Sequence, residues 1–284
     1  MSAVLLSLGQ SYTAQALAPR LSAQGWQLYG ATRSPGKIET IRASGVSPVL
    51  FPDGCGDALA RATALLISAG PDQDGDPVLK ALGPQIAARA GHLDWVGYLS
   101  TTAVYGDHQG GWVDEETPLA PTTRRGGWRA QAEAAWQAIP GLPLHIFRLA
   151  GIYGPGRGPF AKLRRGTAQR IIKPGQVFSR IHVQDIVQVL CASIRHPHPG
   201  RIYNLCDDDP APPQDVIAYA AELLALPVPP AIPFETAELS AMARSFYADN
   251  KRVRNDRIKA ELGVRLIYPD YRAGLSALIA GQGA

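Results

Sequence analysis

The sequence predicts an α/β protein whose core is a doubly wound, mostly parallel β-sheet. Short apolar runs with few charges alternate with longer segments in which apolar residues recur at helical spacing. Such strands need cover on both faces, and helices supply it when right-handed crossovers join parallel strands. The composition agrees, because 46% of the 284 residues are hydrophobic and 18% are charged, as in globular proteins.

The first half of the chain supplies most of the expected sheet. Strands are predicted at 3–8, 26–31, 49–51, 64–68, 95–99 and 144–149. Leu17 and Leu21 recur at helical spacing and predict a helix over 12–24. A second helix is predicted to begin at Asp76-Pro77 and end near residue 90, because Asp is a favoured N-cap and Pro a favoured first helical residue. A third is expected over 128–138.

The pattern changes after Gly151. Residues 154–180 are rich in Gly, Arg and Pro and show no clear period. Later elements are a helix at 183–194, a strand at 201–205, a helix from Pro212-Pro213 to 224, and helical segments that end near 262. We therefore expect a Rossmann-type domain over 1–153, which 181–206 rejoins, and a smaller C-terminal lobe from 154–180 and 207–284.

Charge and cysteine content exclude several classes of partner. The net charge of +4 is dispersed over 28 basic and 24 acidic residues, so a nucleic-acid partner is not expected, while a small anionic ligand is compatible. Cys55, Cys191 and Cys206 lie far apart and show no metal-ligand spacing, which predicts buried thiols, no metal site and a cytoplasmic protein. No stretch approaches the roughly 18 apolar residues of a membrane span, so we expect a soluble protein without a membrane partner.

The turn after the first strand has the form G-x-S-x-x-A, at Gly9-Gln10-Ser11-Tyr12-Thr13-Ala14. Compared with G-x-G-x-x-G, Gly9 supplies the tight turn, Ser11 stands where backbone approaches a pyrophosphate, and Ala14 stands where helix packs on strand. The helix N-terminus adds free N–H groups for an anion. We expect Gly9, Gln10, Ser11, Tyr12 and Thr13 to bind a dinucleotide; the alternative is an ordinary strand–helix turn.

The end of the second strand bears on which dinucleotide is bound. An Asp or Glu at this place usually binds the ribose 2′-hydroxyl of NAD, whereas this chain has Thr32-Arg33-Ser34. Arg33 can pair with a 2′-phosphate, and the two hydroxyls can add donors. The sequence therefore favours NADP over NAD, although a solvated arginine on a loop is the alternative.

Four segments resemble those of one known family, in the same order. Residues 98–106 (YLSTTAVYG), 148–156 (RLAGIYGPG), 181–186 (IHVQDI) and 203–205 (YNL) are similar to segments of the extended short-chain dehydrogenases/reductases. The resemblance runs from residue 3 to about 262 and is closest to the atypical branch described as NAD-dependent epimerase/dehydratase.

The resemblance implies a Rossmann sheet with NAD(P) at its carboxyl edge and a substrate beneath the C-terminal lobe. Relatives often act on nucleotide sugars and often form dimers; here we expect a monomer or homodimer. The hydroxyl that hydrogen-bonds the reacting oxygen falls on Thr101, which by its residue type alone would be a β-branched strand residue. The further cofactor-binding positions that the resemblance implies are Ser68, Ala69, Ser100, Ala150 and Tyr153.

The departures from the family concern proton transfer. Counting back from Glu133, the lysine of the family's Tyr-x-x-x-Lys pair falls on Arg129 and its tyrosine on Arg125. Arg129 can still hold the nicotinamide ribose, but no arginine exchanges a proton readily at neutral pH. The Asp-Glu of the dehydratases is replaced by Thr102-Ala103, which disfavours water elimination by that route.

Other side chains are alternative proton donors. Tyr105, Tyr153 and Tyr12 are candidates, and Tyr105 is taken as the catalytic candidate together with Thr101 and Arg129, although each tyrosine has a structural interpretation. His182 and Asp185 fit the start of a helix, with a catalytic dyad as the alternative.

Two functions from different classes remain at this point. We expect an NAD(P)-dependent oxidoreductase or epimerase with a rearranged acid/base that acts on an anionic small molecule, with a sugar nucleotide as one example. The alternative is a non-catalytic NADP-binding redox sensor or partner-binding protein. Basic residues on loops around the expected cleft would favour a phosphorylated or carboxylated substrate if some converge. These are Arg124, Arg125, Arg129, Arg157, Arg164, Arg165, Arg170, Lys173 and Arg180.

Overall fold

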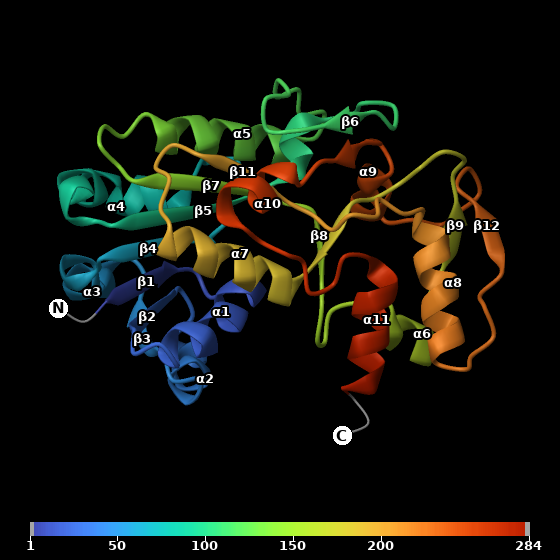
Figure 1. The fold of residues 1–284 in the computed structure, drawn as a ribbon, viewed down its shortest axis with the longest axis horizontal. Coiled ribbons are helices and arrows are strands. Elements are labelled where there is room, and N and C mark those ends of the chain that lie inside the picture. Colours follow the sequence, from blue (N-terminus) through green and yellow to red (C-terminus); the bar gives the residue numbers. More distant parts are fainter. Residues whose placement is uncertain (1–2, 282–284) are drawn as a thin grey trace.

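A seven-stranded parallel sheet forms the centre of the computed structural model, which describes residues 3–281 (Figure 1). The strand order is β11-β7-β5-β4-β1-β2-β3. The strands are β1 (Val4–Leu8), β2 (Gln27–Thr32), β3 (Ser47–Leu50), β4 (Ala64–Ile67), β5 (Trp95–Thr101), β7 (Leu144–Leu149) and β11 (Ile202–Leu205). Because β1 lies centrally and the order reverses beside it, the sheet is doubly wound. The predicted fold class is confirmed.

Helices cover both faces of this sheet. The face with Leu5 packs against α1 (Tyr12–Ser22), α7 (Val183–Arg195) and α10 (Asp256–Leu262). The face with Leu6 packs against α3 (Gly56–Arg61), α4 (Pro77–Ala88) and α5 (Arg124–Gln137). Consecutive residues of β1 point to opposite faces, so an uninterrupted apolar run is what a doubly covered strand requires. The short helix α2 (Ile38–Ala43) connects β2 to β3.

Side-chain caps set the helix starts. The Asp76 carboxylate accepts from the N–H groups of Val78 and Leu79 at 2.8 and 3.1 Å, which confirms the predicted start of α4. Helix α5 begins four residues before the predicted position, because the Thr123 hydroxyl accepts from Gly126 N–H at 3.1 Å. That extra turn brings Arg124 and Arg125 onto the helix.

A smaller lobe stands beyond the carboxyl edge of the sheet, on the right in Figure 1. Its helices are short, so apolar residues recur too few times at helical spacing to be recognised. The sequence therefore did not predict α6, α9 and α11 as separate helices. The lobe contains α6 (Phe160–Arg164), α8 (Pro213–Leu223), α9 (Ala241–Phe246), α11 (Tyr271–Ala280), β9 (Arg170–Ile172) and β12 (Ala231–Pro233). Two pairs of strands connect it to the sheet region, namely β8 (Gly151–Tyr153) with β10 (Arg180–His182), and β6 (Trp112–Val113) with β13 (Arg252–Val253). Residues 1–2 and 282–284 of the predicted domain ranges lie outside the described residues.

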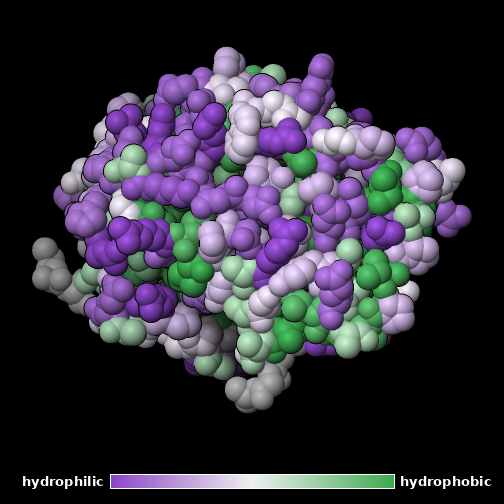
Figure 2. All heavy atoms as spheres, turned by 45° about the vertical axis from the view of Figure 1, so that its right-hand side comes forward, coloured by the Kyte–Doolittle hydropathy of each residue, from purple (hydrophilic) through white to green (hydrophobic). Residues whose placement is uncertain are grey.

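The outer surface differs between the two regions. In Figure 2 hydrophobic residues are more frequent at the lower right, on the side of the lobe, than over the sheet. Across residues 3–281, no helix combines the length and the apolar character that crossing a membrane would need.

Candidate functional site

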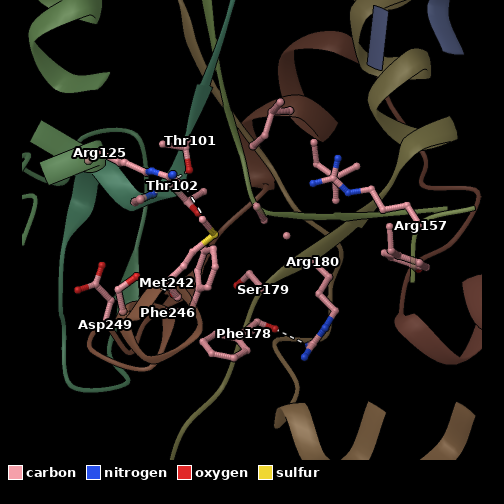
Figure 3. Close-up of a pocket in the computed structure, with 18 of the residues that line it drawn as sticks. Thr101, Thr102, Arg125, Arg157, Phe178, Ser179, Arg180, Met242, Phe246 and Asp249 are labelled. Atoms are coloured by element: carbon pink, nitrogen blue, oxygen red, sulfur yellow. Dashed lines mark hydrogen bonds between the residues drawn. The ribbon is translucent and has the colours of Figure 1, made fainter. Parts of the chain in front are cut away.

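A cleft of about 1400 Å³ lies between the carboxyl edge of the sheet and the lobe. Four consecutive positions along that edge open into it, after β1, β4, β5 and β7. Carboxyl edges at such a reversal of strand order are where doubly wound proteins bind ligands. The lobe supplies the opposite wall (Figure 3).

In the turn after β1, the backbone at Gly9 lies close to the backbone at the end of β4. Gly9 has φ +109°, and a Cβ there would come within 2.9 Å of both the Ala69 nitrogen and the Ser68 hydroxyl. The Ser68 hydroxyl donates to Gly9 C=O at 2.9 Å, and the Ser7 hydroxyl donates to the same oxygen at 2.7 Å. No other residue type fits this position without displacing backbone, so glycine is required here.

Ser11 and Ala14 preserve the geometry of the glycines they replace. The Ser11 hydroxyl accepts from Ala14 N–H at 3.2 Å and so caps α1. Ala14 is buried in the core beneath the helix. The first turn of α1 contains no acidic residue, and Ser11, Tyr12 and Thr13 all line the cleft. A helix N-terminus of this kind fits a dinucleotide pyrophosphate.

The predicted 2′-phosphate residues lie farther along the sheet. Thr32 ends β2 and its hydroxyl accepts from Ser34 N–H at 3.1 Å, while the side chain of Arg33 is exposed. The side chain of Gln10 lies against Gly30 of β2. A Cβ at Gly30 would come within 2.2 Å of the Gln10 amide nitrogen. None of these four side chains lines the cleft, which reaches only the pyrophosphate end of the turn.

Thr101 stands at the carboxyl end of β5, half-buried on the cleft wall. Its hydroxyl accepts from Ala103 N–H at 3.2 Å. That bond uses an oxygen lone pair and leaves the hydroxyl proton available to a ligand. Ser100, on the same strand, and Ala150, directly after the neighbouring β7, also line the cleft.

The two arginines of α5 face different parts of the cleft. Arg129 donates to Leu99 C=O at 2.8 Å and to the Tyr98 hydroxyl at 3.2 Å. Its other terminal nitrogen lies beside Gly70, at the end of β4. Arg125, one turn earlier, extends toward Thr101 and donates to the thioether of Met242 at 3.8 Å (Figure 3).

Tyr105 occupies a structural position. It is fully buried and does not line the cleft. Its hydroxyl donates to Asn204 Oδ1 at 2.7 Å and accepts from Arg148 at 2.9 Å. Burial raises the pKa of Tyr105 to about 12, which opposes proton release at neutral pH. The choice of Tyr105 as a catalytic residue therefore finds no support in its geometry.

The other two tyrosines already donate their protons elsewhere. Tyr12 donates to Pro155 C=O at 2.8 Å, and Tyr153 donates to Asp270 C=O at 3.3 Å, although both line the cleft. His182 and Asp185 begin α7 as the helix pattern indicates. His182 accepts from the Gln184 N–H through Nδ1 at 3.2 Å, and burial lowers its pKa to about 4.

Asp185 binds backbone groups of the chain and does not line the cleft. Its carboxylate accepts from Ile267 N–H at 2.6 Å and Tyr268 N–H at 3.1 Å. It is fully buried, and burial raises its pKa to about 6. No bond joins it to His182, so the described geometry does not form a dyad.

Sequence reasoning missed the partner of Arg180. Arg180 was noted only as one basic residue among many, yet it lines the cleft and donates to Phe178 C=O at 2.7 Å and Ala211 C=O at 3.0 Å (Figure 3). The Asp207 backbone N–H donates to Arg180 C=O at 2.6 Å, and the Asp207 residue is 2% exposed. Neither of its carboxyl oxygens has a hydrogen-bond partner in the described residues. Burial raises the pKa of Asp207 to about 8, with the Arg180 charge opposing that rise. A protonated Asp207 leaves the charge of Arg180 available to an anion.

We expect Asp207→Asn to stabilise the protein at alkaline pH. The pKa is about 8 in the folded state and 3.8 in the unfolded chain, so the folded protein holds an extra proton between those values. The free energy of unfolding of the natural chain therefore falls as pH rises from about 4 to about 8. Asparagine removes this dependence, with a gain on the order of 5 kcal/mol at pH 8 and little change at pH 4. Urea unfolding at both pH values tests this; an unchanged pH slope would contradict it.

The lobe wall opposite Arg125 is apolar. Met242 and Phe246 on α9 are 52% and 63% exposed, and both line the cleft. Beneath them Tyr247 packs edge-on against Phe178, with ring centroids 5.3 Å apart. The short α9 has too few residues for a periodic signal, so the sequence did not predict this wall.

Metal ligands are not gathered in the part of the chain described. Within residues 3–281 no group of three or more His, Cys, Asp or Glu side chains is arranged to hold a metal ion. The cysteines are free and buried at all three positions.

Comparisons with known proteins agree with this architecture. Protein YeeZ of Escherichia coli K12 is 31% identical over 278 residues, which cover 93% of this chain and 95% of that protein. A functionally unknown conserved protein from Silicibacter pomeroyi is 65% identical, with a TM-score of 0.95 and 99% of both chains covered. No protein-family model matches the sequence.

Two further solved structures show the same fold over the whole length. A protein of Methylobacillus flagellatus, provisionally described as an NAD-dependent epimerase/dehydratase, has a TM-score of 0.73 at 26% identity and covers 100% of this chain and 99% of its own. The human epimerase family protein SDR39U1, solved with NADPH, has a TM-score of 0.78 at 18% identity, with 98% and 99% covered. The chain belongs to the family of Protein YeeZ, within the NAD(P)-binding epimerase/dehydratase superfamily of extended short-chain dehydrogenases/reductases.

Proposed function

We propose that this protein is an NADP-dependent oxidoreductase or epimerase that acts on a small anionic substrate. The observation that carries the proposal is the composition of the cleft. One end is the pyrophosphate-type turn at Gly9 and Ser11, and the other holds Thr101 together with the charge of Arg125. The cleft therefore joins a dinucleotide site to a polar centre able to bind a reacting oxygen.

The chain's own residues suggest how such a reaction is assisted. When bound, the nicotinamide supplies hydride transfer. Thr101 donates its free hydroxyl proton as a hydrogen bond to the substrate oxygen, and Arg125, which extends toward Thr101, attracts the anionic group of the substrate. Arg129, fixed by Leu99 C=O, supplies positive charge where the nicotinamide ribose is expected. We take the net proton to come from solvent, because the Tyr12 and Tyr153 hydroxyls already donate to Pro155 C=O and Asp270 C=O.

A second function rests on the absence of the family's Tyr-x-x-x-Lys pair. A redox sensor that binds NADP without turnover would keep the phosphate turn and lose the acid/base pair, as Arg125 and Arg129 illustrate. Such a sensor would not require Thr101 or a large substrate cleft. They favour the enzyme.

Cofactor titration followed by turnover distinguishes the two. We expect calorimetry to detect NADPH binding, and NADPH oxidation to follow when carbonyl compounds with an acidic group are added. Thr101→Ala should reduce the turnover by about 100-fold, an oxyanion-donor effect, with the NADPH affinity unchanged. NADPH binding without oxidation across a broad panel would favour the sensor. No heat with millimolar NADPH or NADH would overturn both functions.

We expect Arg33→Ala to weaken NADP binding about 10- to 100-fold. A charge-assisted bond to the 2′-phosphate contributes about 1.5–3 kcal/mol, and each 1.4 kcal/mol corresponds to tenfold in affinity. NAD lacks that phosphate, so its affinity should not change. Calorimetry with both cofactors measures the difference, and Lys37→Ala, in the following turn, is the control for a nearby exposed charge. Equal losses for NADP and NAD would remove the role of Arg33.

A further inference from the structure

The substrate end of the cleft combines a guanidinium group with an apolar wall. Arg125 crosses the cleft from α5 and meets the thioether of Met242 on α9. Phe246, one turn further along α9, lies beside the same contact (Figure 3). Charge and apolar surface therefore meet at one point, directly across from Thr101 and Thr102.

The charge of Arg125 has no counter-ion. Among residues 3–281, neither Arg125 nor Arg157 nor Arg180 forms an ion pair with a carboxylate. The thioether is a weak acceptor and cannot replace one. Asp249, which also lines this part of the cleft, is engaged by the Thr122 hydroxyl and by the Lys251 ammonium, the latter at 3.3 Å. A planar guanidinium without a partner matches a carboxylate in two parallel hydrogen bonds.

The apolar wall is continuous and exposed to the cleft. Phe246 and Met242 are 63% and 52% exposed, although large side chains of this kind gain free energy from burial. Ile171, Val177 and Tyr247 are buried and also line the cleft. These side chains offer little to the hydroxyl groups of a sugar. They fit a compact apolar group.

We propose, on the basis of the proposed function, that the substrate is a compact apolar carboxylic acid rather than a sugar nucleotide. Its carboxylate pairs with Arg125, and its aryl or branched acyl group packs against Phe246 and Met242. In a sugar nucleotide a ribose separates the base from the diphosphate, whereas here the charge and the apolar wall are in contact. The ligand must therefore carry its acid directly beside its apolar group.

Binding of matched probes to the NADPH-saturated protein tests this by calorimetry. The probes are phenylpyruvate, which has both features, pyruvate, which lacks the apolar group, and UDP-glucose. We expect phenylpyruvate to bind at least tenfold more tightly than either of the others. Phe246→Ala and Arg125→Gln should each weaken it about tenfold or more, and Phe246→Ala should leave the weak binding of pyruvate unchanged.

Controls separate this proposal from the cofactor site. Ile267→Ala removes a similarly exposed side chain, 54%, outside the cleft, and Arg61→Gln removes a surface charge; neither should change any affinity. NADPH affinity is measured separately for every variant. A loss of NADPH binding would count against the proposed function, whereas a loss of phenylpyruvate binding alone bears on this inference. With NADPH bound, equal or tighter binding of UDP-glucose, an unaffected Phe246→Ala variant, or no binding of phenylpyruvate at millimolar concentration would each overturn the proposal.

Discussion

Glu133→Gln is expected to reduce the free energy of unfolding by about 3–5 kcal/mol, although it changes a single charge. The Glu133 carboxylate is 1% exposed and accepts from Arg148 Nη2 at 2.8 Å and from the Ser100 hydroxyl. Arg148 is itself 4% exposed and continues the network to Tyr105 at 2.9 Å. Neutralising Glu133 leaves the guanidinium buried without its counter-charge, which is far costlier than the loss of one hydrogen bond.

Urea unfolding measures the effect, and an exposed pair provides the control. Glu39→Gln breaks the ion pair with Arg42 on α2, whose side chains are 81% and 58% exposed, and should cost less than about 1 kcal/mol. Adding Arg148→Met to Glu133→Gln removes the stranded charge and should recover part of the loss. A change below about 1 kcal/mol in Glu133→Gln would show that the buried charges do not depend on each other.

The network also joins the elements that carry the candidate site. Glu133 belongs to α5, Ser100 to β5 and Arg148 to β7, so the ion pair joins the helix to two adjacent strands. Thr101 follows Ser100, and Arg129 lies one turn before Glu133. The buried Glu133–Arg148 ion pair thus connects the elements that carry Thr101 and Arg129, the groups expected to contact substrate and cofactor.

What the sequence predicted correctly depends on local physics. The apolar runs of β1, β4 and β5 and the Asp76 cap follow from residues close together in the chain, and they predict the sheet and its edge. The Gly9 turn is local only in its φ of +109°, because the crowding at its Cβ position comes from Ser68 and Ala69 at the end of β4. These features determine the fold class and the edge of the sheet that lines the cleft.

The substrate end depends on contacts between distant segments, so the sequence did not reveal it. Arg125 meets Met242 across 117 positions of sequence. The pKa of Asp207 is raised by its burial in the folded protein, and the charge of Arg180 on β10 opposes that rise. The segment around Tyr105 allowed a structural or a catalytic hydroxyl, and Asn204, 99 residues away, accepts a hydrogen bond from it in the buried interior. A titratable residue gains its role from such neighbours, which no local pattern specifies.

Ser11→Asp is expected to abolish dinucleotide binding, with a loss of at least about 100-fold for NADP and NAD alike, while the fold stays intact. Aspartate is as good an N-cap as serine and favours the positive end of the helix dipole, so it can accept from Ala14 N–H as Ser11 does. The free energy of unfolding should therefore be unchanged or slightly higher. The same carboxylate stands where the pyrophosphate would lie, so it repels the two phosphates at short range.

Ser11→Gly is the matched variant, because it restores the glycine of the phosphate-binding motif. It should lose only a few tenths of a kcal/mol of stability with the cap and should bind NADP at least as tightly as the natural chain. Calorimetry for affinity and thermal melting for stability examine both variants together. Opposite effects on binding with nearly equal stability locate the phosphates at the first turn of α1. If Ser11→Asp bound NADP like the natural chain, the pyrophosphate would have to lie elsewhere, and the proposed dinucleotide site at Gly9 would be wrong.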